Sequence, residues 1–362
     1  MNRLMNIRIA FCINNLKIGG AEMLLIDLIN NWPDDFDIYL ILLQNTGDLA
    51  NLIDERKVNK LILKENDFEL YQIIDIHNYF KKYKINFCIS HLERSNKFCL
   101  LASILTSTKV LPVIHNINIY NSVAKLNKLM TRYIYNIFSR KVIAISETVA
   151  EYCLNELKIN TRKIIRIDNG IDFNRVKKYT ENFKFNGKLN FATLGRLENV
   201  KGYDILIKAL SKDKIRNLNW SLKIIGDGSE RDGLKKMAEE FIVNDKVIFF
   251  GAQKFPFRHL TDVHYLIMPS RREGLPLSLL ESLGFGIPVI GSNIGILPFF
   301  IKNGINGFIF NSEDELMLAD IIVHLFSIAD DQYIAMRSFS RKSVENYSIN
   351  NSITKYLKLL NI

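Results

Sequence analysis

Two carboxylates at a fixed spacing mark the stretch of this 362-residue chain that is best suited to chemistry. Glu273 lies in a loop-like segment rich in Pro, Ser and Arg, and Glu281 follows eight residues later. Between them we expect a short helix with Pro276 in its first turn, ended by Gly284 and Gly286. Mostly helical rise then separates the carboxylates by about 10 Å. That distance excludes a shared proton or a single metal ion. It suits two hydroxyl-rich ends of one long ligand, whose anionic middle meets the helix N-terminus.

Two cations elsewhere in the chain complement such a ligand. The segment Gly195-Arg-Leu-Glu-Asn-Val-Lys-Gly202 follows an apolar run, which places Arg196 and Lys201 at the mouth of a strand-to-helix loop. Paired cations of this kind suit a pyrophosphate. One such cation is usually a solvated surface charge, whereas two beside the paired glutamates indicate a functional site. A nucleotide sugar, with hexose, pyrophosphate and ribose in line, has the matching shape.

The paired glutamates also carry a family resemblance. Glu273-Gly-Leu-Pro276, with a second glutamate eight positions after the first, resembles the motif of the family 4 retaining glycosyltransferases. The resemblance covers essentially the whole chain and is shared by Gly19-Gly20, by Asn169-Gly-Ile-Asp172 and by Gly195-Arg-Leu with its later Lys-Gly pair. One departure is Phe299, which stands where the family commonly has an acid, so contacts on that side of the donor are not implied.

For the fold, the resemblance implies the GT-B architecture of two Rossmann-like domains facing across a cleft. The expected divisions are an acceptor-binding domain over 1–178, a nucleotide-sugar-binding domain over 187–345, and a C-terminal helix over 346–362 that packs back on the first domain. Residues 179–188 are polar and are predicted to be the linker.

For the site, the resemblance implies that His115, Arg196, Lys201 and Glu273 act in catalysis. Glu273 would hold hexose hydroxyls and Glu281 the ribose, while the two cations would stabilise the departing nucleoside diphosphate in place of a metal ion. A phosphate oxygen would accept the proton of the acceptor, and we identify no separate base. Donor contacts are expected from the glycine turns, the helix start and the second glutamate: Gly19, Gly20, Gly195, Gly228, Gly274, Leu275, Pro276 and Glu281.

The order of apolar runs independently predicts an α/β fold with parallel sheets, because strand-like and helix-like patterns alternate. The predicted strands are 7–13, 37–43, 60–63, 86–90, 110–115, 141–145 and 164–167 in the first half, and 189–194, 221–225, 246–250 and 264–268 in the second. Helical patterns cover 68–83 and 122–138, and also 313–362 with a break at 348–352.

Two smaller features need a choice between structural and functional interpretations. His115 ends a predicted strand, where open α/β sheets bind ligands, although a histidine at a sheet edge can be purely structural. In the resembled family this histidine contacts the donor hexose. Asp35-Phe-Asp37 could resemble the metal site of the other glycosyltransferase fold, GT-A, but it follows a Pro and precedes a strand, so we predict a turn.

Composition bounds the class of protein. The chain is 48% hydrophobic, which is enough for two packed cores. Its four cysteines show neither metal-ligand nor disulfide spacing, which is typical of a reducing compartment. No signal peptide and no run of about 18 apolar residues is visible, so a cytoplasmic protein is expected.

The charge distribution predicts a polyanionic partner. The formal net charge is +10, and residues 75–141 hold eleven basic and two acidic residues, which gives +9 for that window. Lys125, Lys128 and Arg132 form a basic row at helical spacing beside an apolar stripe. The stripe could pack on the sheet, but it could also hold the protein at an anionic membrane surface. We expect peripheral binding to the inner face of the cytoplasmic membrane, near a lipid-linked acceptor.

The function expected from these features is retaining transfer of a hexose or N-acetylhexosamine from a nucleotide sugar, preferably UDP-linked, without a metal cofactor. The Asn-, Ile- and Lys-rich composition indicates a bacterial surface-polysaccharide enzyme, with a lipopolysaccharide, O-antigen or capsule acceptor. One alternative is a GT-B nucleotide-sugar 2-epimerase, which would lack this spacing of cations and glutamates. The other is a basic membrane- or nucleic-acid-binding protein without activity. It gives no reason for the four charged residues to occur together, and no nucleic-acid-binding motif is visible.

Overall fold

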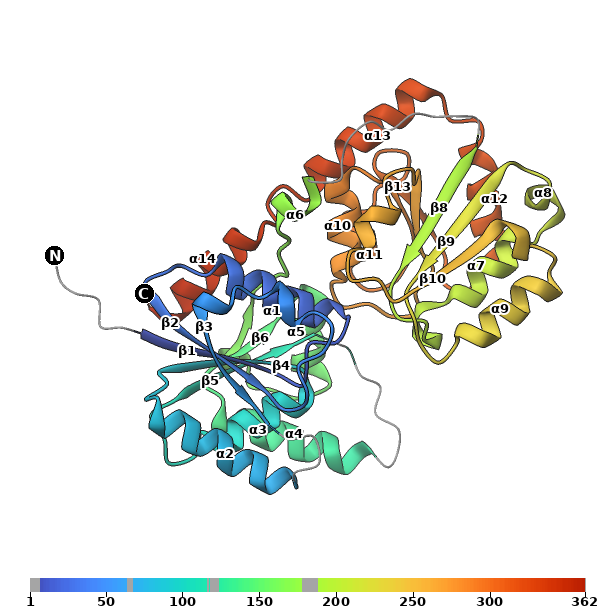
Figure 1. The fold of residues 1–362 in the computed structure, drawn as a ribbon. Helices are drawn as coiled ribbons and strands as arrows, with labels where there is room; N and C mark the ends of the chain where they lie inside the picture. Colours follow the sequence, from blue (N-terminus) through green and yellow to red (C-terminus); the bar gives the residue numbers. More distant parts are fainter. Residues whose placement is uncertain (1–6, 64–67, 116, 118–123, 178–187, 362) are drawn as a thin grey trace. The chain divides into compact units, whose positions relative to one another are not determined.

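The computed structural model describes residues 7–63, 68–115, 117, 124–177 and 188–361, which form two compact units (Figure 1). Unit 1 comprises Met1–Gly170 with Ile349–Ile362, and unit 2 comprises Ile171–Ser348. The chain therefore divides inside the Asn169–Asp172 tetrapeptide, eight residues before the end of the first division expected from sequence (178 minus 170). Residues 178–187, which hold most of the expected linker, lie outside the described residues.

Unit 1 is built on a seven-stranded sheet in the order β3-β2-β1-β4-β5-β6-β7, and its printed pairings are all parallel. The strand order reverses between β1 and β4, and such a switch point is where α/β sheets bind ligands. The strands are β1 (Ile7–Ile13), β2 (Phe36–Leu42), β3 (Val58–Ile62), β4 (Phe87–His91), β5 (Lys109–Ile114), β6 (Val142–Ala144) and β7 (Ile164–Arg166).

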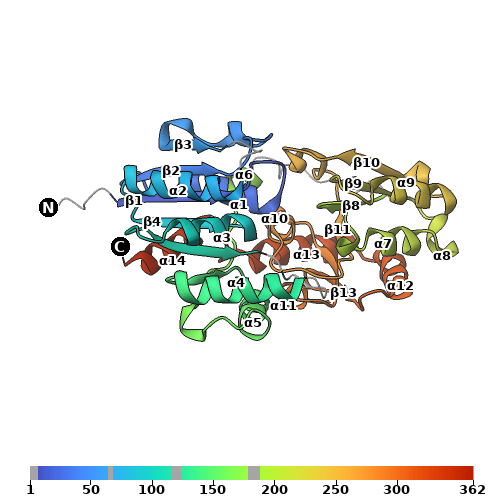
Figure 2. The same cartoon turned by 90° about the horizontal axis from the view of Figure 1, so that it is seen from below.

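Helices cover both faces of this sheet. In Figures 1 and 2, α2, α3 and α4 lie side by side over one face, and α1 and α14 lie together over the other. Both faces are covered because the crossovers between parallel strands are right-handed. Crossovers that run in opposite directions along the sheet from the switch point therefore place their helices on opposite faces. The helices of unit 1 are α1 (Gly20–Asn31), α2 (Glu69–Lys82), α3 (Glu93–Ala102), α4 (Ala124–Phe138), α5 (Glu147–Asn155) and α14 (Ile349–Leu360).

Helix α14 completes unit 1 with residues from the far end of the chain. Its buried face includes Ile353 and Tyr356, and the Tyr356 ring lies 6.0 Å from that of Trp32, which follows α1. Ser352 Oγ donates a 2.8 Å hydrogen bond to the carbonyl of Asp168. The expected return of the C-terminal helix to the first domain is confirmed.

The predicted helix break at 348–352 is wrong. Helix α13 ends at Ser343 and α14 begins at Ile349, so the interruption comes one turn earlier. The reason lies in the Ser and Asn residues of this stretch, which favour helix N-termini as readily as loops. Here they start the last helix.

Unit 2 repeats the architecture with a six-stranded parallel sheet in the order β10-β9-β8-β11-β12-β13. Its switch point lies between β8 and β11. The strands are β8 (Leu189–Leu194), β9 (Trp220–Ile225), β10 (Val247–Gly251), β11 (Tyr265–Met268), β12 (Val289–Ser292) and β13 (Gly307–Phe310). The helices are α6 (Phe173–Lys177), α7 (Tyr203–Leu210), α8 (Asp213–Arg216), α9 (Arg231–Glu240), α10 (Leu277–Phe285), α11 (Leu297–Phe300), α12 (Glu315–Leu325) and α13 (Asp330–Ser343).

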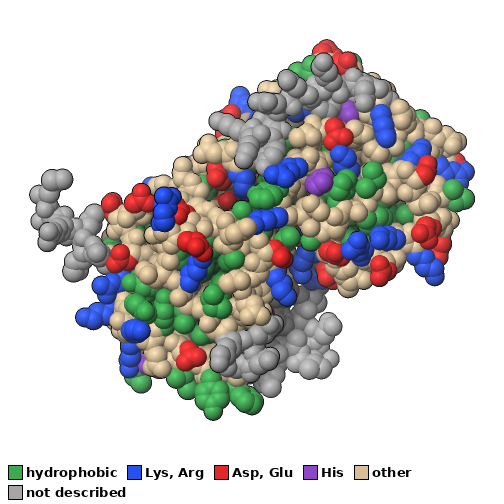
Figure 3. All heavy atoms as spheres, in the orientation of Figure 1, with side chains coloured by type: hydrophobic (Ala, Val, Ile, Leu, Met, Phe, Trp, Pro, Cys, Tyr) green, Lys and Arg blue, Asp and Glu red, His purple; other side chains and the backbone are tan. Residues whose placement is uncertain are grey.

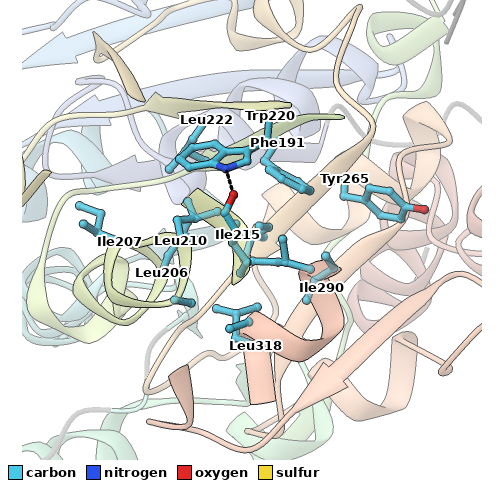
Figure 4. Packing of buried hydrophobic residues seen from close by; sticks show 14 of the residues in the cluster. Phe191, Leu206, Ile207, Leu210, Ile215, Trp220, Leu222, Tyr265, Ile290 and Leu318 are labelled. Carbon is cyan, nitrogen blue, oxygen red and sulfur yellow. Dashed lines mark hydrogen bonds between the residues drawn. The ribbon is translucent and has the colours of Figure 1, made fainter. Parts of the chain in front are cut away.

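The core of unit 2 forms where side chains of β8, β9 and β11 meet α7 and α12 (Figure 4). Phe191, Leu206 and Leu318 are fully buried there. Trp220 is 1% exposed, and its indole Nε1 donates a 3.0 Å hydrogen bond to the carbonyl of Ile215, so this polar atom is satisfied inside the core. The chain has two tryptophans, and each unit buries one of them.

The predicted parallel α/β architecture is confirmed, and the predicted strands agree with the structure to within one or two residues at either end. The elements that were not predicted include helices α3, α5 and α9 and strand β13. Asp34 and Asp35 lie in a turn, as expected, but Asp37 belongs to β2, where Arg8 Nε lies 3.6 Å from its carboxylate. This aspartate therefore has a structural partner.

We predict that Tyr356→Ala will destabilise unit 1 selectively, because it removes a buried ring that covers Trp32. The expected loss is about 3–5 kcal/mol of the unfolding free energy of unit 1. Denaturant unfolding, monitored by tryptophan fluorescence, measures this loss in two single-tryptophan variants. Trp220→Phe leaves Trp32 as the reporter of unit 1, and Trp32→Phe leaves Trp220 as the reporter of unit 2. Tyr356→Phe is the matched control. Equal shifts of both reporters would contradict the prediction.

Candidate functional site

The two loops at the switch point of unit 2 bring the predicted charged residues together. The loop after β8 carries Lys201 and the loop after β11 carries Glu273, and Lys201 Nζ lies 2.6 Å from Glu273 Oε1. Ser270 Oγ donates a second hydrogen bond of 2.7 Å to the same oxygen. The Glu273 side chain is 7% exposed and that of Lys201 is 18% exposed, so the pair is largely shielded from water. Adjacent parallel strands end at the same edge of a sheet, which is why residues 72 positions apart in sequence meet here.

Arg196 differs from Lys201 in its surroundings. It is exposed, and among the residues that the structure describes no carboxylate forms an ion pair with it. Gly195, with φ of +154°, turns the chain into this loop, and a side chain at Gly228 would collide with the backbone of Leu197. These glycines set the path of the loop and leave the guanidinium accessible to an anion.

The N-terminus of α10 follows directly after Glu273. Pro276 occupies the N-cap with φ −70° and ψ 132°, so the prediction that it lies in the first turn is wrong by one residue. Its extended ψ makes it the residue before the helix, although its φ suits both positions. Within the described part of the chain no side chain caps α10, which leaves N–H groups of its first turn available. Gly274 and Leu275 are buried beside it, and Leu275 is 3% exposed.

The two glycines predicted to end α10 have separate roles. Gly286 is the left-handed C-cap, with φ of 82°. Gly284 lies inside the helix, where a Cβ would come within 3.0 Å of Ile171 and 3.2 Å of Phe173. Gly286 is therefore required by its backbone conformation, and Gly284 by the close approach of neighbouring side chains.

Glu281 has a partner that sequence reasoning missed. Arg175, on α6, places Nη2 at 2.9 Å from Glu281 Oε1, and the Glu281 side chain is 8% exposed. A buried carboxylate needs such a cation. The available signal was the position of Arg175 just after the Asn169–Asp172 tetrapeptide, but nothing in the spacing connects it to a residue 106 positions later.

Arg271 is a second residue that the sequence did not single out. Its guanidinium makes a bidentate pair with Asp204, at 2.8 and 2.9 Å, and binds Glu313 with Nε at 2.6 Å. Nη1 also donates to the carbonyl of Asn199 at 2.6 Å, and the backbone N–H of Arg271 donates to the carbonyl of Val200 at 2.8 Å. These bonds hold the Lys201 loop against the Glu273 loop from both side chain and backbone.

The same contact requires a glycine at position 202. Gly202 has φ of +66°, and a Cβ there would lie 2.0 Å from the carbonyl oxygen of Pro269. Any larger residue would separate the two loops. Lys201 reaches Glu273 because the following residue has no side chain.

In unit 1, the predicted glycines lie at the start of α1. Gly19 is the N-cap, and the Glu22 carboxylate folds over it so closely that a Cβ would lie 2.2 Å from an oxygen. Gly20 has no neighbouring atom within 4 Å of such a Cβ, so this side of the turn is open. The turn can therefore admit a ligand atom at Gly20.

His115 follows β5 and makes a side-chain bond to another histidine. His91 Nδ1 lies 2.9 Å from His115 Nε2, with His91 fully buried and His115 9% exposed. Burial lowers the pKa of His115 to about 4, and burial together with the neighbouring His115 ring lowers the pKa of His91 well below its usual value. Both rings are therefore neutral at pH 7. His115 lines a cavity with Glu93, Asn96, Thr131 and Tyr135.

The basic row on α4 is only partly described. Lys128 pairs with Glu156 at 2.7 Å, Arg132 is exposed, and the side chain of Lys125 lies outside the described residues. Among the described side chains of the apolar stripe, Leu129, Met130, Tyr133 and Ile137 are exposed and Ile134 is half-buried, whereas the buried side of the helix is formed by Thr131 and Tyr135. Exposed apolar side chains on α4 are Leu129, Met130, Tyr133, Ile137 and Phe138, and on or beside α2 they are Phe68, Leu70, Tyr71 and Ile74. Figure 3 shows hydrophobic side chains gathered over the α2 side of unit 1.

Two family models match adjoining parts of the chain. Glycosyltransferase Family 4 matches residues 18–175, and Glycosyl transferases group 1 matches residues 176–342. Together they cover residues 18–342, which hold every strand of both sheets except β1 and all the charged residues of the candidate site. The chain belongs to the family 4 glycosyltransferases.

Curated relatives are distant in sequence but agree in class. An uncharacterised glycosyltransferase of Haemophilus influenzae is 26% identical over 65% of this chain and 65% of its own length, so the match spans about two thirds of that relative. An Escherichia coli O-antigen biosynthesis glycosyltransferase, WclY, is 26% identical over 73% of this chain and 81% of its own. An E. coli UDP-Gal:alpha-D-GlcNAc-diphosphoundecaprenol alpha-1,3-galactosyltransferase is 24% identical over 92% of this chain and 90% of its own.

Solved structures agree in fold. An Anabaena protein, HepE, in complex with UDP and glucose superposes with a TM-score of 0.84 at 18% identity, covering 98% of this chain and 99% of that one. WaaG, a glycosyltransferase involved in lipopolysaccharide biosynthesis, superposes with a TM-score of 0.73 at 16% identity, covering 97% and 99%. With two Rossmann-like units, the predicted GT-B fold is confirmed.

We predict that Glu273→Ala will lower kcat by roughly a hundredfold or more, because it removes a buried carboxylate that the site positions with two hydrogen bonds. Steady-state kinetics with the best nucleotide-sugar donor measures the loss, and circular dichroism checks the fold. Glu239→Ala, at an exposed position on α9, is the matched control and should leave kcat unchanged. An active Glu273→Ala variant would mean that this carboxylate is not part of the reaction.

Proposed function

We propose that this protein transfers a hexose or N-acetylhexosamine from a UDP-sugar, with retention at the anomeric carbon, to a lipid-linked glycan acceptor. The observation that carries the proposal is the largely shielded Lys201–Glu273 pair, beside the N-terminus of α10 and an exposed Arg196 that has no ion pair among the described residues. A cation pair, a helix end and a carboxylate at one sheet edge match a diphosphate joined to a hydroxyl-rich sugar. The match to family 4 supports the same reaction class.

In the proposed reaction, the bond between the anomeric carbon and the diphosphate oxygen breaks, and a bond to the acceptor oxygen forms on the same face. Arg196, Lys201 and the N–H groups of α10 stabilise the charge that develops on the departing diphosphate. The acceptor proton passes to a phosphate oxygen of that leaving group. Glu273 holds hydroxyls of the hexose, and Glu281, oriented by Arg175, holds hydroxyls of the ribose.

The donor and acceptor classes are inferred from named relatives. The Anabaena structure contains UDP and glucose, and an E. coli relative is named for a UDP-galactose donor and a diphosphoundecaprenol-linked acceptor. O-antigen and lipopolysaccharide enzymes recur among the relatives. These names support a UDP-sugar donor and a place in surface-polysaccharide assembly.

We further propose that unit 1 binds the inner face of the cytoplasmic membrane peripherally. No helix among the described residues combines the length and apolar character needed to cross a bilayer. The exposed apolar side chains of α4 lie in the window of +9 charge, those of α2 lie just before it in sequence, and this combination suits an anionic lipid surface. A lipid-linked acceptor is presented at such a surface.

The central test is donor turnover without added metal. We expect hydrolysis or transfer from at least one member of a panel of UDP- and GDP-sugars, with products identified by mass spectrometry and anomeric configuration by NMR. Activity in EDTA should equal activity in magnesium, because protein cations take the role of the metal. Loss in EDTA that magnesium restores would refute metal independence alone. No turnover of any sugar, together with no UDP binding by calorimetry, would refute the proposed function.

For the membrane proposal, the expected result is co-sedimentation with anionic liposomes that is weakened by salt. The triple variant Met130→Ser, Tyr133→Ser, Ile137→Ser should lose much of this binding. Ile334→Ser with Phe339→Ser, which removes exposed apolar side chains from α13 in unit 2, is the matched control. The membrane proposal would be refuted by equal partitioning onto neutral and anionic vesicles. Equal binding by the triple variant and the control variant would also refute it.

A further inference from the structure

His115 contacts a second histidine, His91, which the register of the sheet places beside it. His91 is the last residue of β4 and pairs with Val113 of β5. Side chains alternate along a strand, so His115, two residues beyond Val113, points to the same face as His91. The rings stand 5.1 Å apart between centroids with an interplanar angle of 32°. This geometry gives the 2.9 Å contact between His91 Nδ1 and His115 Nε2.

The contact contains a single proton. Two neutral imidazoles each carry one N–H, and two nitrogens at hydrogen-bond distance need one donor and one acceptor. The proton between the rings therefore belongs either to His91 Nδ1 or to His115 Nε2. The choice fixes the tautomer of both rings.

The remaining nitrogen of His91 decides between these arrangements. His91 Nε2 is buried, and among the described residues it has no hydrogen-bond partner. If His115 donated, His91 would carry its proton on Nε2, as a buried N–H with no acceptor. If His91 donates, Nε2 is left as a bare lone pair. Orphaned buried N–H donors are rarer than under-satisfied acceptors, so the second arrangement is favoured.

We propose that His91 is a positioning residue that donates its Nδ1 proton to His115 Nε2 and thereby fixes His115 as an Nδ1–H donor. His115 Nε2 is then occupied, so the ring can offer a ligand one N–H and no basic nitrogen. Among the described residues no group is bonded to His115 Nδ1, and His115 lines the cavity with Glu93 and Thr131. The ligand atom that fits is a hydroxyl or carbonyl oxygen. Its assignment to a sugar hydroxyl rests on the proposed function.

The tautomer can be measured directly and without substrate. Full-length protein with ¹⁵N-labelled histidine gives long-range ¹H–¹⁵N correlations from its six histidines, and His115→Gln and His91→Leu assign the pair. Near pH 7 we expect His115 to be protonated on Nδ1 and bare on Nε2, and His91 to show the same pattern. Protonation of His115 on Nε2, or a positively charged His115 at that pH, would overturn the proposal even if transferase activity is found.

Two substitutions of His91 separate positioning from packing. His91→Asn keeps an N–H close to the position of Nδ1, so the His115 tautomer and kcat should stay near wild type. His91→Leu keeps the volume but removes the donor, so His115 should become a tautomer mixture and kcat should fall about tenfold. Thr108→Val, which removes a buried hydrogen bond at the other end of β5, is the control for stability.

The readouts distinguish this proposal from the proposed function. If no nucleotide sugar is turned over, the NMR result still tests the tautomer assignment. If His91→Leu and Thr108→Val lower the unfolding midpoint equally while kcat and the His115 signals stay at wild type, His91 is structural and the proposal is wrong.

Discussion

The ion pair between Lys201 and Glu273 is the interaction on which the candidate site depends. It exists because the sheet of unit 2 reverses its strand order between β8 and β11, so the loops after these strands meet at one edge. Gly202 lets the backbones touch, and Arg271 holds the two loops together. Removing one partner of such a shielded pair leaves an uncompensated charge, at a cost of about 3–5 kcal/mol. The site is therefore a property of the fold, and each loop alone would present an ordinary surface charge.

Three carboxylates around this edge each have a cation as partner. Glu273 has Lys201, Glu281 has Arg175, and Asp204 has Arg271. Arg196 has no such carboxylate among the described residues. An incoming dianion would meet a free guanidinium and a helix N-terminus first, and would then compete with Glu273 for Lys201. The carboxylate released by that exchange becomes available to hydroxyl groups of the same ligand. Under the proposed function, one binding event would both neutralise the phosphates and free the carboxylate that is proposed to hold the sugar.

The sequence predicted the framework well because buried parallel strands are short, nearly continuous apolar runs, and both sheets consist of them. It also located the residues at the centre of the site, since Lys201 and Glu273 belong to motifs with local spacing. It did not predict α3, whose sequence mixes charged residues with Cys and Phe and gives a weak helical period. The partners Arg175 and Arg271 were missed for another reason: their bonds cross 106 and 67 positions of sequence. Such ion pairs depend on how the folded chain packs, and they produce no periodic pattern in the sequence. The His91–His115 contact follows from strand register, which a sequence does not specify.

The return of α14 to unit 1 has a consequence for how the chain is made. Unit 2 is continuous in sequence, whereas unit 1 is completed only by residues that follow all of unit 2. During synthesis, domains fold in the order in which they emerge. The first unit to emerge must therefore wait, with the Trp32 side of its sheet uncovered, until the second has been translated. Unit 2 can therefore complete its folding before unit 1, because the last segment of unit 1 is also the last to leave the ribosome.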